Sequence, residues 1–221
     1  MKRTAFALCN DAFDQAIAQA HIGISEIDLW RIMQAQTFLN GADSGDPFPL
    51  IFGNGDFTYG RPASTRTLTS GDYVWADFRA TYGGYPADRN RTARAGEPDA
   101  WELDAYTAVR EMTLELCNSI RAGMTCAEVH ARASKMWAPV SVGQKWLGVK
   151  RFGHGGGMDV TEPPSLGATD NTVIRPGMIL HVEPKLEREG AVFQFEECIY
   201  VREDGIEFLT PLCPETMLLI Q

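Results

Sequence analysis

The residues of this chain best suited to chemistry are four carboxylates and one histidine in three separate segments. They are Asp77 and Asp88, then His154, then Glu183 and Glu196. Four carboxylates gathered in one place would repel one another strongly. Two divalent cations would remove that repulsion, because hard oxygen ligands suit such ions. The set therefore predicts a centre for two metal ions with five protein ligands, provided that the fold brings the three segments together.

The first two acids lie on a predicted β-hairpin with the sequence VWADFRATYGGYPADRNRT. Side chains of a strand alternate between its faces, so the register of the hairpin decides whether the two acids can meet. A turn at Tyr82–Gly83 would place Asp77 directly opposite Asp88. A turn at Gly83–Gly84 would make them diagonal neighbours. Both registers keep the two carboxylates on one face.

The last two acids lie on a second predicted hairpin, ILHVEPKLEREGAVFQFEECIYV. A two-residue turn at Glu189–Gly190 pairs Arg188 with Ala191. The same register sets Glu183 directly opposite Glu196. Each hairpin thus presents two acids on the same side of a strand pair.

Predicted helices surround both hairpins and must position them. Ser25, Asp99 and Thr125 each stand at the start of a helical pattern and precede an acidic residue by three positions, as capping residues do. The predicted helices cover residues 5–21, 25–38, 98–121 and 125–136, and short strands are expected within 138–175 and at 206–209. The order is helix, helix, hairpin, helix, helix, strand, hairpin. It predicts an α+β fold with two related halves that face each other across a central site.

Composition limits the partners and the compartment. The chain has 221 residues and a net charge of −9, which argues against nucleic acid or an anionic membrane as a partner. No stretch approaches the ~18 apolar residues of a membrane span, and the N-terminal apolar run is too short for a signal peptide. Five scattered cysteines without a CxxC pair are typical of reduced thiols in a cytoplasmic protein.

Five motifs occur in a distinctive order: GDYVWADF, YPADRNRT, GHGGGMDV, PGMILHVEP and FEECIYVREDG. Through them nearly the whole chain resembles the pita-bread metallohydrolases, the creatinase/aminopeptidase family. That family includes methionine aminopeptidase, Xaa-Pro aminopeptidase, prolidase and creatinase. The resemblance implies a pita-bread fold, with two pseudo-symmetric halves and a curved antiparallel sheet around a dinuclear metal site.

The resemblance also implies individual roles. Asp77 and Asp88 would be metal ligands, with Asp88 bridging the two ions. His154 and Glu183 would each bind one ion, and Glu196 would bridge. A water or hydroxide between the ions would attack a carbonyl, with Glu183 as the proton shuttle. The carboxylate-rich set favours manganese, with iron, cobalt or zinc as the other candidates.

Two positions depart from the peptidase pattern. Tyr59 and Thr161 stand where peptidases of the family usually have histidines that contact substrate or stabilise charge. Tyr59 could donate its phenol to a substrate carbonyl or simply pack beside the site. His181 stands where the family usually has Thr, Ser or Asn. It could donate a hydrogen bond behind the metal ligands, replace a lost substrate histidine, or be a packed histidine bonded to a carbonyl. The catalytic candidates are therefore Glu183, His154, Tyr59 and His181.

The resulting hypothesis is a single catalytic domain over residues 1–221. Creatinase- and prolidase-type members also carry an N-terminal domain, so the chain is either naturally single-domain or truncated at its start. The expected activity is metal-dependent hydrolysis of an amide or C–N bond in a small peptide-like substrate of the Xaa-Pro peptidase or creatinase type. The alternatives are a non-peptidase that acts on a small zwitterionic metabolite and a non-enzymatic relative that binds peptides or proteins. The expected partners are a small substrate and a second copy of the chain in a homodimer.

Overall fold

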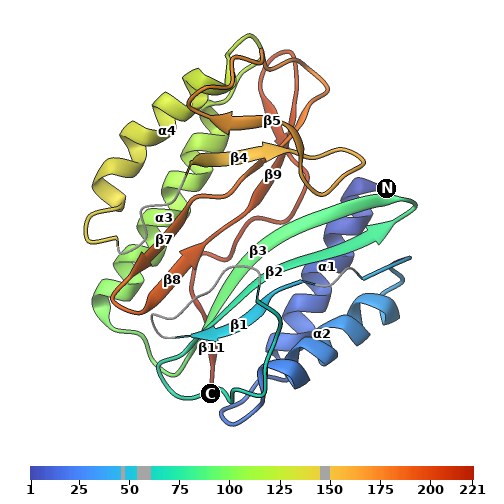
Figure 1. Ribbon diagram of the computed structural model, residues 1–221, viewed down its shortest axis with the longest axis vertical. Coiled ribbons are helices and arrows are strands. Elements are labelled where there is room, and N and C mark those ends of the chain that lie inside the picture. The colour runs from blue at the N-terminus through green and yellow to red at the C-terminus, as the bar shows by residue number, and fades with distance from the viewer. Residues whose placement is uncertain (46–47, 54–60, 145–149) are drawn as a thin grey trace.

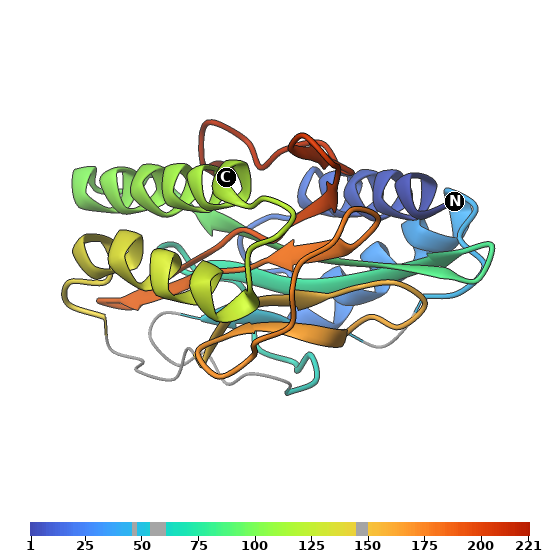
Figure 2. The same ribbon diagram turned by 90° about the horizontal axis from the view of Figure 1, so that it is seen from above.

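A computed structural model describes residues 1–45, 48–53, 61–144 and 150–221. Two α+β halves lie next to each other, with helices α1 and α2 beside one sheet and α3 and α4 beside the other (Figure 1). Seen from above, α1 and α3 share a layer on one side of the strands (Figure 2). The expected order of two helices and a hairpin in each half is confirmed.

The N-terminal half packs two helices against a four-stranded sheet with the order β1-β2-β3-β11. Val74, Ala76 and Phe78 of β2 join the core beneath α1 and α2, so strand alternation turns Asp77 to the opposite face. The elements of this half are α1 (Lys2–Ile17), α2 (Glu26–Leu39), β1 (Leu50–Gly53), β2 (Tyr73–Tyr82), β3 (Tyr85–Ala95) and β11 (Leu218–Ile220).

The C-terminal half contains a five-stranded sheet with the order β10-β9-β6-β4-β5 and a separate hairpin, β7-β8. Trp137 of α4 packs edge-on against Phe152 of β4, which joins the helices of this half to its sheet. The elements are α3 (Ala100–Ser119), α4 (Cys126–Val140), β4 (Arg151–Gly155), β5 (Glu162–Gly167), β6 (Ile179–Val182), β7 (Lys185–Arg188), β8 (Ala191–Gln194), β9 (Glu197–Val201) and β10 (Ile206–Phe208).

The predicted starts of α2, α3 and α4 agree with the structure within two residues, whereas α1 begins at Lys2 rather than residue 5 and some ends differ. Capping boxes begin α3 and α4, and the Ser25 side chain caps α2. Helix α1 ends at Ile17 rather than near residue 21, because its last residues form tighter bonds three positions apart. Helix α4 runs past residue 136 to Val140, although Pro139 lies in its last turn and provides no backbone N–H donor there. Strand β11 was not predicted; it is only three residues long and pairs in parallel with β3.

The first hairpin turns at Gly83–Gly84, so the alternative turn at Tyr82–Gly83 is wrong. Both glycines have positive φ, +58° and +79°. A tight hairpin turn needs positive φ at both central positions, which glycine adopts without strain and tyrosine does not. Asp77 therefore lies opposite Asn90, and Asp88 is its diagonal neighbour.

The second hairpin turns at Glu189–Gly190 as predicted, and Arg188 pairs with Ala191. The hairpin is not continuous, because its hydrogen-bonded pairing stops between β7-β8 and β6-β9. The register is the same on both sides of this gap. Glu183 and Glu196 face each other within this gap, and neither belongs to the hydrogen-bonded strand pairs on its two sides.

Candidate metal centre

Four buried side chains from both halves of the molecule converge on one point. Asp88 of β3, His154 of β4, His181 of β6 and Glu196 each offer an atom that could bind a metal ion, and these atoms all lie within 4.8 Å of one another. Glu196 connects the halves directly, because its backbone N–H donates to the carbonyl of Asn90, 3.4 Å away. The gap in the second hairpin permits this contact, since a paired residue would bond within its own sheet.

The two remaining predicted ligands border this group. Glu183 Oε1 lies 3.4 Å from His154 Nε2. Asp77 is buried, and its negative charge raises the pKa of both Glu183 and Glu196, after the larger effect of burial. The structure thus brings all five predicted ligands into one region, and their role as ligands stays a prediction.

The electrostatics of the region suit divalent cations. Burial raises the pKa of Asp88, Glu183 and Glu196 well above the usual carboxyl range, and the charges of neighbouring acids raise it further. Burial also lowers the pKa of His154 and His181 to about 3, so both rings are neutral near pH 7. Neutral imidazole and carboxylate oxygen are suitable ligands, and a cation would relieve the repulsion between the acids. The residues present therefore fit a metal ion.

The ring of His154 is held in the orientation that metal binding requires. Its Nδ1 lies 3.0 Å from the carbonyl of Gly155, which can only accept a hydrogen bond. Nδ1 therefore carries the proton, and the lone pair of Nε2 faces Asp88 and Glu183, at 3.8 and 3.4 Å. The flanking glycine is needed for close packing, because a Cβ on Gly155 would lie 2.5 Å from the carbonyl oxygen of Pro163.

The other candidate residues are Tyr59, Thr161 and His181. Tyr59 lies outside the described residues. Thr161 is exposed in the turn before β5. His181 is fully buried, and its Nδ1 lies 2.6 Å from Glu196 Oε1, so it contacts a carboxylate rather than a backbone carbonyl.

Two arginines that form ion pairs with the acids were missed by sequence reasoning. Arg79 Nε lies 3.5 Å from Asp88 Oδ1, and Arg151 Nη2 lies 3.7 Å from Glu183 Oε1. Strand alternation could have revealed Arg79, which shares a face with Asp77. No comparable signal identifies Arg151, because β4 reaches Glu183 only through the tertiary fold.

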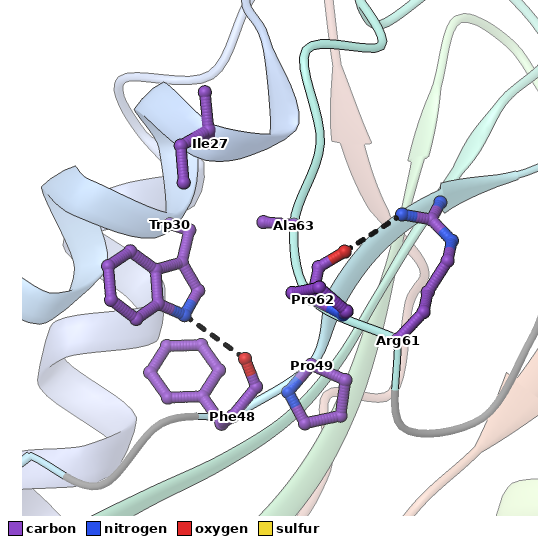
Figure 3. A pocket seen from close by; sticks show the side chains of 7 residues that line it. All are labelled: Ile27, Trp30, Phe48, Pro49, Arg61, Pro62 and Ala63. Atoms are coloured by element: carbon purple, nitrogen blue, oxygen red, sulfur yellow. Dashed lines mark hydrogen bonds between the residues drawn. The ribbon is translucent and has the colours of Figure 1, made fainter.

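An apolar pocket lies away from the acids, between α2 and the segments around β1 (Figure 3). Its volume is about 280 Å³, and the indole N–H of Trp30 donates to the Phe48 carbonyl at its wall. None of the five predicted ligands lines it.

In the described part of the chain, no helix has both the length and the apolar character that a membrane crossing requires.

Comparison with known proteins identifies relatives of this arrangement. The chain is 31% identical over 217 residues to the uncharacterized peptidase YqhT of Bacillus subtilis, an overlap of 96% of this chain and 60% of that protein. It is 34% identical over 161 residues to the probable dipeptidase PepE of Mycobacterium tuberculosis, covering 71% of this chain and 42% of that protein. The chain thus spans 60% or less of the length of these curated relatives.

Solved structures agree with the fold. An Xaa-Pro dipeptidase from Bacillus anthracis superposes with a TM-score of 0.87 at 28% identity, over 99% of this chain and 61% of that one. An X-Pro aminopeptidase from Thermotoga maritima superposes with a TM-score of 0.90 at 24% identity, over 99% of this chain and 61% of that one. The expected pita-bread fold is confirmed. The model of metallopeptidase family M24 matches residues 1–203, and the chain belongs to that family.

Proposed function

We propose that this chain carries the catalytic centre of a dinuclear metal-dependent hydrolase that cleaves an amide or C–N bond in a small peptide-like substrate. One observation carries the proposal: buried carboxylate and imidazole groups from both halves converge within 4.8 Å. Membership of a metallopeptidase family supports it.

The proposed ligands are the five residues predicted from the sequence. Asp88 and Glu196 would each contact both ions, whereas Asp77, His154 and Glu183 would each contact one. Manganese is the proposed metal, because the donor set is rich in carboxylates. When bound, two such ions would lower the pKa of a shared water towards ~7 and polarise the scissile carbonyl.

Glu183 is the proposed acid–base residue. Its side chain is 16% exposed, compared with 6% for Asp88 and 1% for Glu196, so it is the most accessible of these three carboxylates to a substrate. Gln194 Nε2 donates to Glu183 Oε2 over 3.3 Å and restrains the carboxylate. Glu183 would take a proton from the attacking water and deliver it to the leaving nitrogen, a role worth ~10²–10⁴ in rate.

The second part of the proposal concerns the substrate. The names of the relatives suggest dipeptides, and two of the superposed or matching proteins act on Xaa-Pro or X-Pro bonds by name. Tyr59 and Thr161 replace the two histidines expected of peptidases, and each lost donor to a developing oxyanion costs ~10²–10³ in rate. We therefore expect weak cleavage of Xaa-Pro dipeptides. A small zwitterionic metabolite is the alternative substrate, and Tyr59 could compensate in part for the lost donors.

We also propose a cytoplasmic location and a homodimer. The location is supported by the five cysteines, all unpaired and buried, which suit a reducing compartment. Size-exclusion chromatography with light scattering would test the dimer, and a monomer at all concentrations would contradict it.

Metal analysis of the purified protein tests the core of the proposal. After incubation with Mn²⁺ and removal of free ion, mass spectrometry of the metal content should find two ions per chain. A protein that binds no metal and hydrolyses nothing would instead favour the non-enzymatic, peptide-binding alternative.

A substrate panel tests the chemistry. Mn²⁺-dependent turnover would be compared for Xaa-Pro dipeptides, Met-peptides and small zwitterions. The double substitution Tyr59→His and Thr161→His should raise cleavage of dipeptides, whereas Thr169→His, at an exposed position after the end of β5, should not. Vigorous dipeptide cleavage by the unmodified protein would contradict the role given to the two departures.

A further inference from the structure

We propose that His181 is a positioning residue that fixes the Glu196 carboxylate by a hydrogen bond from Nδ1, and that it does not itself bind metal. The inference deepens the proposed metal centre and rests on it. It concerns a residue for which the sequence of the chain alone left three roles open.

His181 occupies the middle of a row of side chains across three strands. It pairs with His154 of β4 on one side and with Cys198 of β9 on the other. Its ring stacks on that of His154, with centroids 4.9 Å apart and an angle of 15°. His181 therefore braces one proposed ligand by ring contact while it bonds to another.

The hydrogen bonds determine which ring nitrogen carries the proton. Nδ1 lies 2.6 Å from Glu196 Oε1, and Glu196 would be ionised as a metal ligand, a state in which it only accepts hydrogen bonds. In a neutral ring Nδ1 must then be the donor and Nε2 the acceptor. Cys198 suits this arrangement, since its Sγ lies 3.6 Å from Nε2 and a thiol is a weak donor.

Neither ring nitrogen is left for a metal ion. The Nδ1 proton is directed at Glu196, and Nε2 lies next to Cys198 Sγ and to the space that a Cβ on Gly156 would occupy. A Cβ at Gly156 would lie only 2.5 Å from Nε2, so the imidazole fills the space that a side chain would need. The third glycine of the segment GHGGG thus leaves room for His181, which a smaller Thr or Ser would not require.

Mn²⁺ titration of the metal-free protein by calorimetry tests the role. His181→Leu removes the donor and should weaken Mn²⁺ binding 10- to 100-fold, the usual cost of losing a residue that supports a ligand. His181→Asn keeps an N–H donor near the position of Nδ1 and should bind close to the parent. The number of ions bound should be the same in all three proteins.

Two glycine substitutions test the position of the His181 ring without changing His181 itself. Gly156→Ala should displace His181 and weaken Mn²⁺ binding in the same way as His181→Leu. Gly205→Ala is the matched control, because no atom lies within 4 Å of a Cβ there. Circular dichroism melts of the metal-free proteins would confirm that each variant is folded.

Several outcomes would overturn the inference. Parent-like affinity in His181→Leu would remove the positioning role. Equal losses in the Asn and Leu variants, with one ion fewer, would make His181 a ligand. Nitrogen-15 NMR of the metal-free parent, recorded at a pH high enough to ionise Glu196, gives a test that does not depend on metal binding. It should find the proton of His181 on Nδ1, and a proton on Nε2 instead would refute the proposal even if the protein bound no metal and the proposed function failed.

Discussion

Glu196 and Glu197 are adjacent in the sequence, identical in chemistry and both buried, yet they belong to two different regions. Glu196 lies among other acids in the candidate metal centre, and its pKa is raised by burial and by the charge of Asp77. Glu197 begins β9, and strand alternation turns it to the opposite side.

On the side away from the candidate metal centre, Glu197 lies near two arginines and a backbone N–H group. Its Oε1 lies 2.9 Å from Arg91 Nη2 and accepts from the N–H of Cys213 over 2.8 Å. Its Oε2 lies 3.9 Å from Arg89 Nη1. One carboxylate therefore balances two buried guanidinium groups and holds the C-terminal segment to β3 and β9.

The difference between the two glutamates comes from their neighbours. A buried charge without an opposite partner is unfavourable, and a paired one becomes part of the structure. The acids around Glu196 raise one another's pKa, and a bound cation would relieve this repulsion, which is the property of a metal site. Glu197 is already matched by its arginines, which is the property of a structural ion pair.

Loss of Glu196 should have the largest functional effect. Glu196→Ala and Asp88→Ala should each remove at least one Mn²⁺ ion and abolish turnover, because each residue is proposed to contact both ions. The measurements are metal content and hydrolysis by the same preparation. Two ions per chain in either variant would refute the bridging assignment.

Loss of Glu197 should instead damage the fold. Glu197→Gln leaves two buried arginines without their carboxylate and should lower the free energy of unfolding by about 3–5 kcal/mol. Urea unfolding of the metal-free protein would measure this, with Glu196→Gln as the matched control. Equal destabilisation by the two substitutions would break the distinction between the two regions.

The smallest expected effect is the change in the stability of the metal-free protein with pH. The pKa of Glu196 is raised in the folded state, so its contribution to stability is full below the unfolded value near ~4.3 and is lost as pH rises through the folded value. The lowered pKa of His154 and His181 acts in the opposite direction, but only up to their unfolded value near ~6.5.

The acids should therefore make the melting temperature of the metal-free protein fall as pH rises from their unfolded value near ~4.3 towards their raised folded values, against the opposite trend of the two histidines. Glu196→Gln should have a flatter profile, with a difference of about 1.4 kcal/mol for each pKa unit by which the Glu196 carboxyl is raised. Parallel profiles for parent and variant would show that the pKa of Glu196 is not raised in the folded, metal-free protein.

Much of the fold was predictable because it depends on near neighbours in the chain. Ser25, Asp99 and Thr125 each determine a helix start through hydrogen bonds within one turn. The Glu189–Gly190 turn determines its hairpin in the same local way. Helix ends and β11 were less predictable, because the parallel pairing of β11 with β3 joins residues more than a hundred positions apart.

The sequence by itself determined which acids share a face and which could meet, since a period of two is a property of any strand. Only the tertiary structure decided that the second hairpin opens at Glu183 and Glu196, that Glu196 bonds to Asn90 in the other half, and that His181 contacts a carboxylate. It also separated Glu196 from Glu197. The physical reason is that the chemistry of a buried charge depends on which distant groups surround it, and packing alone brings those groups together.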